Sequence, residues 1–114
     1  MNRIYRTKFD AEHHIEGHAT CGKTHEHAYS LVVYLGKDDF DMGGRDECID
    51  FHDIKELVDS VVNKYDHTDM GDMSCVKLAE LLHKEITVMF IDKWGMICSE
   101  IELYETEHFG VRYP

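Results

Sequence analysis

Alternating apolar and polar residues mark two early segments of the chain as β-strands. From Tyr5 to Ile15 the odd positions are mostly apolar and the even positions mostly charged, and residues His25 to Leu35 alternate in a similar way. A period of two residues is typical of a strand with one buried face. The segment between them, Glu16–Thr24, contains two glycines and is predicted to be a loop.

Two later segments carry apolar residues at helical spacing. Asp50 is a candidate N-cap for the first helix, whose apolar stripe begins at Ile54 and ends near Tyr65. Ser74 is a candidate N-cap for the second helix, which we expect to continue to about Ile91. Each helix therefore presents one apolar face that requires a partner surface.

The remaining segments complete the predicted pattern. The polar runs 37–47 and 66–73 are expected to be loops. Alternation returns over 96–106, where Glu105 closes a mostly apolar face, and residues 108–113 form a short last strand. The element order ββααββ predicts an α+β fold with a four-stranded antiparallel sheet and two helices on one face. We expect a single domain over residues 1–114.

Composition excludes several function classes. The net charge is −11 with histidine neutral, and no Lys/Arg cluster of the kind that binds nucleic acid occurs. No apolar run reaches the roughly 18 residues of a membrane span, and the N-terminus lacks the apolar core of a signal peptide. We therefore expect a soluble protein of the cytoplasm, with no membrane and no nucleic-acid partner.

Three histidines are candidate metal ligands. Alternation places His25 and His27 on one side of their strand, and it turns Glu26 away. The same argument selects His13 over His14, because His13 shares the apolar face of its strand. Three imidazoles with an open fourth position form a usual catalytic zinc site. The alternative is that the three histidines are unrelated residues in polar pockets.

Five further residues are candidates for chemistry around such a site. A metal or base near Cys21 would lower the pKa of its thiol, although an ordinary loop cysteine is equally consistent with the pattern. Asp66 and His67 could act as a general acid–base pair, but acidic loops are common. Glu105 could bind a guanidine-like edge through two hydrogen bonds, or it could simply reach water. Lys23 could supply positive charge to a phosphate.

These residues resemble, in order and spacing, the 6-pyruvoyltetrahydropterin synthase and 6-carboxytetrahydropterin synthase family. The resemblance extends over nearly the whole chain and rests on five dispersed motifs. They are Phe9-x-Ala11-x-His13, Cys21-x-x-x-His25-x-His27-x-Tyr29, Ile49-Asp50-Phe51, Asp66-His67 and Tyr104-Glu105-Thr106. The gap of three residues between Cys21 and His25 is similar to that of the bacterial and archaeal 6-carboxytetrahydropterin synthases.

The resemblance implies an assembly and a set of roles. It implies a tunnelling fold (T-fold), in which three ββααββ subunits form a barrel and two barrels stack into a homo-hexamer with active sites between subunits. It implies Zn²⁺ on three histidine ligands, Cys21 as the catalytic thiol, Asp66 and His67 as its partners, and Glu105 as the pterin anchor. The implied metal ligands are His13, His25 and His27.

The chain departs from the family pattern at two places. Glu26 stands where the family usually has glycine between the two histidines, and its outward direction leaves the metal site intact. At the start of the second helix the family has Pro-Thr-x-Glu, which helps to hold the pterin. This chain has Met73-Ser74-Cys75-Val76 and lacks the glutamate. The second departure bears on substrate identity more than on fold or metal.

The resemblance implies a zinc-dependent lyase as the leading functional hypothesis. Such an enzyme converts 7,8-dihydroneopterin triphosphate to 6-carboxy-5,6,7,8-tetrahydropterin and releases triphosphate and acetaldehyde, on the route to queuosine or archaeosine. One alternative is the 6-pyruvoyl reaction, or side-chain cleavage to a hydroxymethyl pterin. Another is a non-catalytic zinc-binding oligomer that retains only the scaffold.

Overall fold

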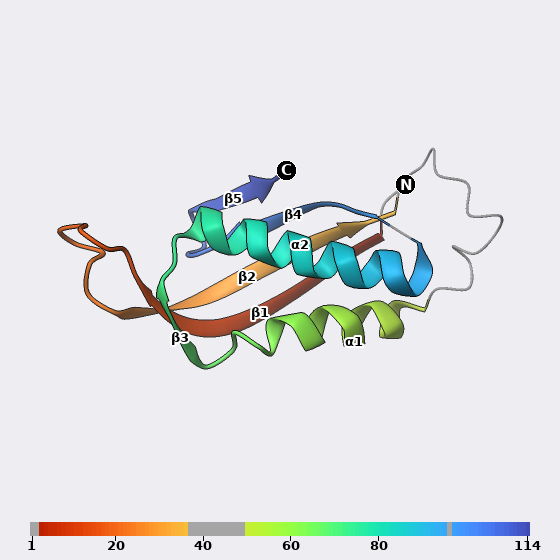
Figure 1. Cartoon of the computed structure of the whole chain (residues 1–114), viewed down its shortest axis with the longest axis horizontal. Helices are drawn as coiled ribbons and strands as arrows, with labels where there is room; N and C mark the ends of the chain where they lie inside the picture. The colour runs from red at the N-terminus through yellow and green to blue at the C-terminus, as the bar shows by residue number, and fades with distance from the viewer. Residues whose placement is uncertain (1–2, 37–49, 96) are drawn as a thin grey trace.

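Two helices pack on one face of a mixed β-sheet (Figure 1). The computed structural model describes residues 3–36, 50–95 and 97–114, so the loop predicted over 37–47 lies outside the described residues. The elements in chain order are β1 (Arg3–His14), β2 (His25–Leu35), α1 (Phe51–Val62), β3 (Thr68–Asp72), α2 (Cys75–Trp94), β4 (Cys98–Tyr104) and β5 (Gly110–Tyr113). The predicted α+β class is confirmed.

The sheet has one strand more than the sequence pattern predicts. Its order is β3-β1-β2-β4-β5, and every neighbouring pair is antiparallel except β3 with β1, which is parallel. The prediction of a loop over 66–73 is therefore wrong for the residues of β3. This edge strand carries no apolar alternation, and main-chain pairing to β1, such as Ala11 with Thr68, forms it.

Both helices begin at the predicted caps. Asp50 accepts a hydrogen bond from the His52 N–H at 2.9 Å, and the Ser74 hydroxyl accepts one from the Lys77 N–H at 3.1 Å. These side chains satisfy N–H groups that have no partner within the helix. The Ser74 cap fixes where α2 starts and makes Cys75 its first residue.

The helix ends differ from the prediction by about one turn. α1 ends at Val62 rather than near Tyr65, and the chain continues in turns. α2 extends past Ile91 to Trp94, where Gly95 adopts φ 66° and donates its N–H back to the Ile91 carbonyl. A left-handed residue of this kind ends helices because it turns the chain away from the helix axis.

The core lies between the sheet and the two helices. A bulge in β4 changes its predicted facing: Leu35 pairs with Cys98 while Tyr34 pairs with Glu100, so one residue of β4 is extra. Cys98 consequently turns into the core, and Ile97, which we expected on the buried face, is 38% exposed. The largest fully buried side chains are Tyr29, Phe90, Leu31, Leu35, Ile54, Leu78, Leu82, Ile86, Ile101, Leu103 and His13.

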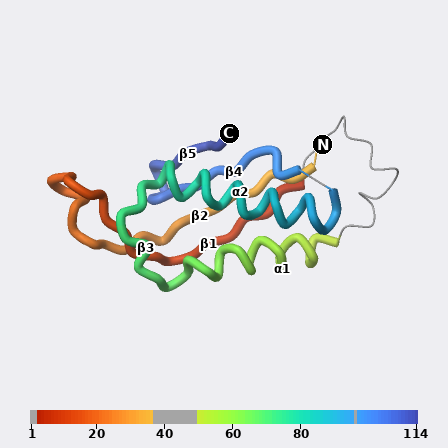
Figure 2. Tube along the Cα trace, in the orientation of Figure 1, coloured from red at the N-terminus to blue at the C-terminus, as the bar shows by residue number. Residues whose placement is uncertain are grey.

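The connection between β1 and β2 projects beyond the end of the sheet (Figure 2). It spans residues 15–24 and is closed at its base by a hydrogen bond from the Ile15 N–H to the Cys21 carbonyl, at 2.6 Å. The loop therefore carries Cys21 at the same end of the molecule as the histidines that end β1 and begin β2. In the described part of the chain, no helix is long and apolar enough to cross a membrane.

Candidate metal centre

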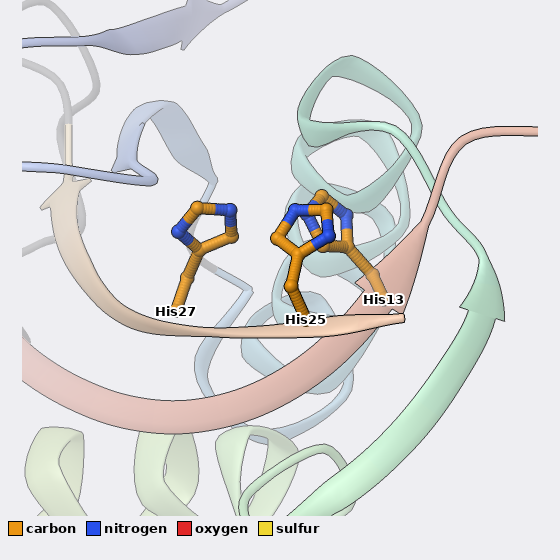
Figure 3. Close-up of side chains that lie close together, drawn as sticks. All are labelled: His13, His25 and His27. Carbon is orange, nitrogen blue, oxygen red and sulfur yellow. The ribbon is translucent and has the colours of Figure 1, made fainter. Parts of the chain in front are cut away.

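Three imidazoles converge from the adjacent ends of β1 and β2 (Figure 3). His13 pairs directly with His25 across the two strands, and His27 follows on the same side of β2. The ring centroid of His13 lies 4.5 Å from that of His25 and 4.9 Å from that of His27. One nitrogen from each ring lies within 4.8 Å of the others, so the three residues could hold a metal ion.

Hydrogen bonds to main-chain carbonyls orient two of the rings. His13 Nδ1 donates to the Met73 carbonyl at 2.6 Å, and His25 Nδ1 donates to the Lys23 carbonyl at 2.7 Å. A carbonyl only accepts, so Nδ1 carries the hydrogen and Nε2 of the neutral ring keeps its lone pair. This is the usual outer support of a metal-binding histidine.

The His13 ring contains an unsatisfied polar atom. His13 is 1% exposed, and its buried Nε2 atom makes no hydrogen bond. A buried polar atom without a partner is costly and calls for a ligand or ion. Zinc accepts imidazole nitrogen in tetrahedral sites, so the donor set fits this metal.

His27 is held in the form that binds metals. Burial lowers the pKa of its imidazole, and the neighbouring His13 and His25 lower it further, while Glu105 opposes them. The lowered pKa favours the neutral His27 ring near pH 7, because burial and the neighbouring histidines each penalise the imidazolium. Only the neutral ring offers a lone pair to a metal.

The two residues that the alternation turns away from the cluster do lie elsewhere. Glu26 is exposed on the opposite face of β2, paired across the strands with Glu12. His14 lies 3.2 Å from the Glu16 carboxylate through its Nε2 atom. The structure thus separates the histidine neighbours as the sequence predicts, while their role as metal ligands stays a prediction.

Glu105 reaches the cluster from the end of β4, the strand next to β2. It follows β4, and its Oε1 atom lies 3.1 Å from His13 Nε2 and 3.5 Å from His27 Nε2. Its main-chain N–H donates to the Phe109 carbonyl at 3.0 Å, which fixes the start of the β4–β5 connection. The carboxylate that closes the mostly apolar face of this segment therefore faces two of the candidate metal ligands.

Tyr29 is a residue of the site that sequence reasoning did not single out. Its side chain is fully buried, its ring lies 5.7 Å from His27 and 6.1 Å from His13, and its hydroxyl has no hydrogen-bond partner. Burial, and then the charge of Glu105, raises the pKa of the hydroxyl, which stays protonated. The signal was available, because Tyr29 follows His27 on the same face of the strand.

Cys75 also borders the site. It is the first residue of α2, half-buried, with its thiol 3.8 Å from the Leu103 carbonyl. Burial and the nearby charge of Glu105 raise the pKa of this thiol to about 11. Cys75 is therefore a neutral thiol at pH 7 and a poor nucleophile.

Cys21 lies in the projecting loop, where a histidine organises the main chain around it. The His18 Nδ1 atom accepts hydrogen bonds from the N–H groups of Thr20 and Cys21, at 3.2 and 2.9 Å. The Cys21 thiol is partly exposed and lies 3.8 Å from the Thr20 hydroxyl. The loop leads into β2, which carries two of the candidate ligands, and the role of Cys21 as the catalytic thiol stays a prediction.

Asp66 and His67 contact each other but not the histidine cluster. His67 Nδ1 lies 3.0 Å from the Asp66 carboxylate, and their side chains gather with that of Asp10. The N–H of Asp10 donates to Asp66 and, with the adjacent His67, holds the pKa of that carboxyl below its ordinary value. Alternation along β1 turns Asp10 away from His13. Within one chain, Asp66 and His67 therefore lie on the opposite face of the sheet from the histidine cluster.

Lys23 enters the described site through its main chain. Its carbonyl holds the His25 ring, and its side chain is exposed. The predicted contact of the ammonium group with a phosphate stays a prediction. The carbonyl contact shows that residue 23 also positions a candidate metal ligand, a role that any residue type could perform.

Comparisons with known proteins agree with the geometry. The family model described as 6-pyruvoyl tetrahydropterin synthase matches residues 3–114. A protein of Archaeoglobus fulgidus named "Putative 6-carboxy-5,6,7,8-tetrahydropterin synthase" is 32% identical over 106 residues, covering 80% of this chain and 90% of that protein.

Two solved structures show the same fold. Caenorhabditis elegans 6-pyruvoyl tetrahydropterin synthase superposes with a TM-score of 0.76 at 16% identity, covering 99% of this chain and 94% of that one. The Plasmodium falciparum 6-pyruvoyl tetrahydropterin synthase gives 0.62 at 16% identity, with 99% of both chains covered. With its fold, its histidine cluster and a family match across almost its full length, the chain belongs to the 6-pyruvoyl tetrahydropterin synthase family.

Proposed function

We propose that the chain is a zinc-dependent lyase that converts 7,8-dihydroneopterin triphosphate to 6-carboxy-5,6,7,8-tetrahydropterin. Water is consumed, and triphosphate and acetaldehyde are released. The observation that carries the proposal is the unsatisfied His13 Nε2 beside His25 and His27, with an accessible thiol four residues before His25. The name of the Archaeoglobus fulgidus relative supports this reaction within the family.

The metal is assigned to the histidine cluster. His13, His25 and His27 would hold Zn²⁺, and the main-chain carbonyls of Met73 and Lys23 would keep two of the rings in place. The ion supplies Lewis-acid polarisation of substrate oxygens when bound. A site that is closed on the His13 side by burial excludes water there, which strengthens electrostatic effects on a bound substrate.

The other residues of the chain are assigned to proton transfer and substrate binding. Cys21 moves a proton to and from the substrate side chain as thiolate and thiol. Glu105 accepts hydrogen bonds from the 2-amino group and ring N–H of the pterin, an edge that matches a carboxylate in the way an arginine does. Lys23 contacts the triphosphate, and its exposed ammonium group is free to reach a ligand in solution.

A second subunit completes the site in this proposal. Asp66 and His67 face away from the cluster of their own chain, so a neighbouring copy must supply the pair that assists Cys21. The two sheet edges, β3 and β5, are available for pairing between copies. A homo-hexamer made of two trimers, with active sites at subunit interfaces, meets this requirement.

The start of α2 favours a second candidate within the same chemistry. The residue that stands in place of the family's glutamate, Val76, is 54% exposed, so an apolar side chain borders the region where a charged one is usual. A different reaction at the side chain of the pterin, giving a 6-pyruvoyl or hydroxymethyl product, would fit this change. The biosynthetic route to queuosine or archaeosine is assigned only under the first candidate.

Product analysis distinguishes these candidates. Zinc-loaded protein is incubated with 7,8-dihydroneopterin triphosphate, and the products are identified by mass spectrometry. Acetaldehyde with a 6-carboxy pterin supports the lyase, whereas a 6-pyruvoyl or hydroxymethyl pterin supports the second candidate. The variant Cys21→Ala should lose turnover and retain zinc. Absence of turnover in wild-type protein, with ligand binding unchanged in Cys21→Ala, would favour a non-catalytic zinc-binding oligomer.

Metal analysis tests the ligand assignment separately. His25→Ala should lose most of its bound zinc, because a site with two protein ligands binds zinc far more weakly than one with three. His14→Ala is the matched control, since His14 is the sequence neighbour of His13 on the opposite face of β1. Full zinc occupancy in His25→Ala would overturn the assignment of the metal centre.

A further inference from the structure

Glu105 occupies a position that its role as a ring anchor does not explain. Its Oε1 atom lies between two candidate metal ligands, 3.1 Å from His13 Nε2 and 3.5 Å from His27 Nε2. The Phe109 carbonyl fixes its main chain, and the side chain is 28% exposed. The carboxylate is thus held against the cluster and still has one side open toward solvent.

The facing atoms of Glu105 and His13 are both donors that a metal ion can accept. His13 donates its Nδ1 hydrogen to Met73, so in the neutral ring Nε2 presents a lone pair to the carboxylate. No hydrogen bond forms at Nε2 despite the short distance to Glu105. A carboxylate oxygen and an imidazole nitrogen that face each other at this distance are both suited to bind one metal ion placed between them.

The distances match those between ligands of one metal ion. Zinc binds histidine nitrogen and carboxylate oxygen at about 2.0–2.2 Å, so two ligands of a tetrahedral zinc lie about 3.3–3.5 Å apart. The Glu105 oxygen stands at 3.1 and 3.5 Å from two of the three histidine nitrogens. Relative to His13 and His27, the Glu105 oxygen therefore stands at about the distances expected between ligands of one zinc ion.

We propose that Glu105 is the fourth protein ligand of the metal when no substrate is bound, and that a ligand with a guanidine-like edge draws the carboxylate away. The inference rests on the proposed metal site at His13, His25 and His27. It assigns Glu105 two successive partners. In the resting protein the carboxylate closes the coordination sphere, and in the complex it holds the ring and leaves a position open.

The test uses the cobalt(II)-substituted protein, because the visible absorption bands of Co²⁺ report changes in its ligands. Azide is the probe of an open position. In wild-type protein the bands should be unaffected by azide, since a protein carboxylate fills the fourth position. In Glu105→Gln the bands should change on azide addition, and zinc should bind on the order of tenfold more weakly in a chelator competition. Glu107→Gln is the matched control, from the same connection but 87% exposed.

Two results would overturn the proposal in distinguishable ways. If azide shifts the bands of wild-type and Glu105→Gln protein equally and zinc affinity is unchanged, the fourth ligand is water and the inference fails alone. If wild-type protein gives no tetrahedral Co²⁺ bands, the metal site itself fails and the inference falls with it. The wild-type azide measurement does not depend on the folding of any variant.

Discussion

Replacing Tyr29 with phenylalanine should make the metal-free protein more stable. The hydroxyl is fully buried and has no hydrogen-bond partner, whereas the ring stacks on Phe9 with centroids 5.0 Å apart. Phenylalanine retains the stacked contact and removes only the oxygen. Because an unsatisfied buried hydroxyl costs about 1–3 kcal/mol, we expect the free energy of unfolding to rise by about 1–2 kcal/mol.

The measurement is urea unfolding of Tyr29→Phe and wild-type protein in a chelator, at equal protein concentration, followed by circular dichroism. In a parallel thermal melt, the melting temperature should rise by about 4–8 °C for each kcal/mol gained. Tyr5→Phe is the matched control, because the Tyr5 hydroxyl donates to the Asp59 carboxylate at 2.8 Å. That variant should lose about 1 kcal/mol, since it deletes a hydrogen bond that is made.

A destabilised Tyr29→Phe would refute the reasoning. If it lost 1 kcal/mol or more, as expected for Tyr5→Phe, the hydroxyl would have a partner in solution, such as a buried water or the Glu105 carboxylate. Equal stability of Tyr29→Phe and wild type would show that the hydroxyl is solvated in the metal-free protein. Only a gain in stability agrees with an unpartnered group kept beside the candidate metal centre.

Three further predictions concern other parts of the molecule. Hydrogen bonds from Tyr104, Tyr34 and Arg112 hold the pKa of Glu102 at about 2, below its ordinary 4.5. Glu102→Gln should therefore lower the free energy of unfolding by about 2 kcal/mol at pH 7. The difference in this free energy from wild type should disappear as the pH falls from about 4.5 to about 2, and urea unfolding at several pH values measures it. Gly95→Ala, at a φ of 66°, should lower the free energy of unfolding by about 1 kcal/mol in the same assay, and an unchanged value would contradict the strained cap. Removal of zinc should lower the melting temperature at pH 7 and have little effect below about pH 5, where protonated imidazoles no longer bind metal.

Strand alternation was enough to predict the histidine cluster. Alternation puts His13 on the apolar face of β1 and puts His25 and His27 on the apolar face of β2, and the pairing of these two neighbouring strands brings the three together. Local rules of this kind depend only on neighbours in the chain. The two helix caps at Asp50 and Ser74 were predictable for the same reason.

Features that depend on pairing between distant segments were not predictable. Strand β3 forms because its main chain meets β1, and its side chains, such as Asp69 and Gly71, carry no strand pattern. The contact of Glu105 with the cluster brings together residues some ninety positions apart, which alternation cannot place. The separation of Asp66 from the cluster likewise depends on the tertiary fold.

The hydrogen bond from His13 to the Met73 carbonyl has a consequence for how this family can diverge. The acceptor is a main-chain atom, so any side chain at position 73 preserves it as long as the backbone follows the same path. Substitutions at the junction of β3 and α2 can therefore change the side chains there while the ring of the candidate ligand His13 keeps its orientation. The residues typical of the family at this junction can therefore be replaced without disturbing the histidine cluster. Loss of that motif does not by itself indicate loss of activity.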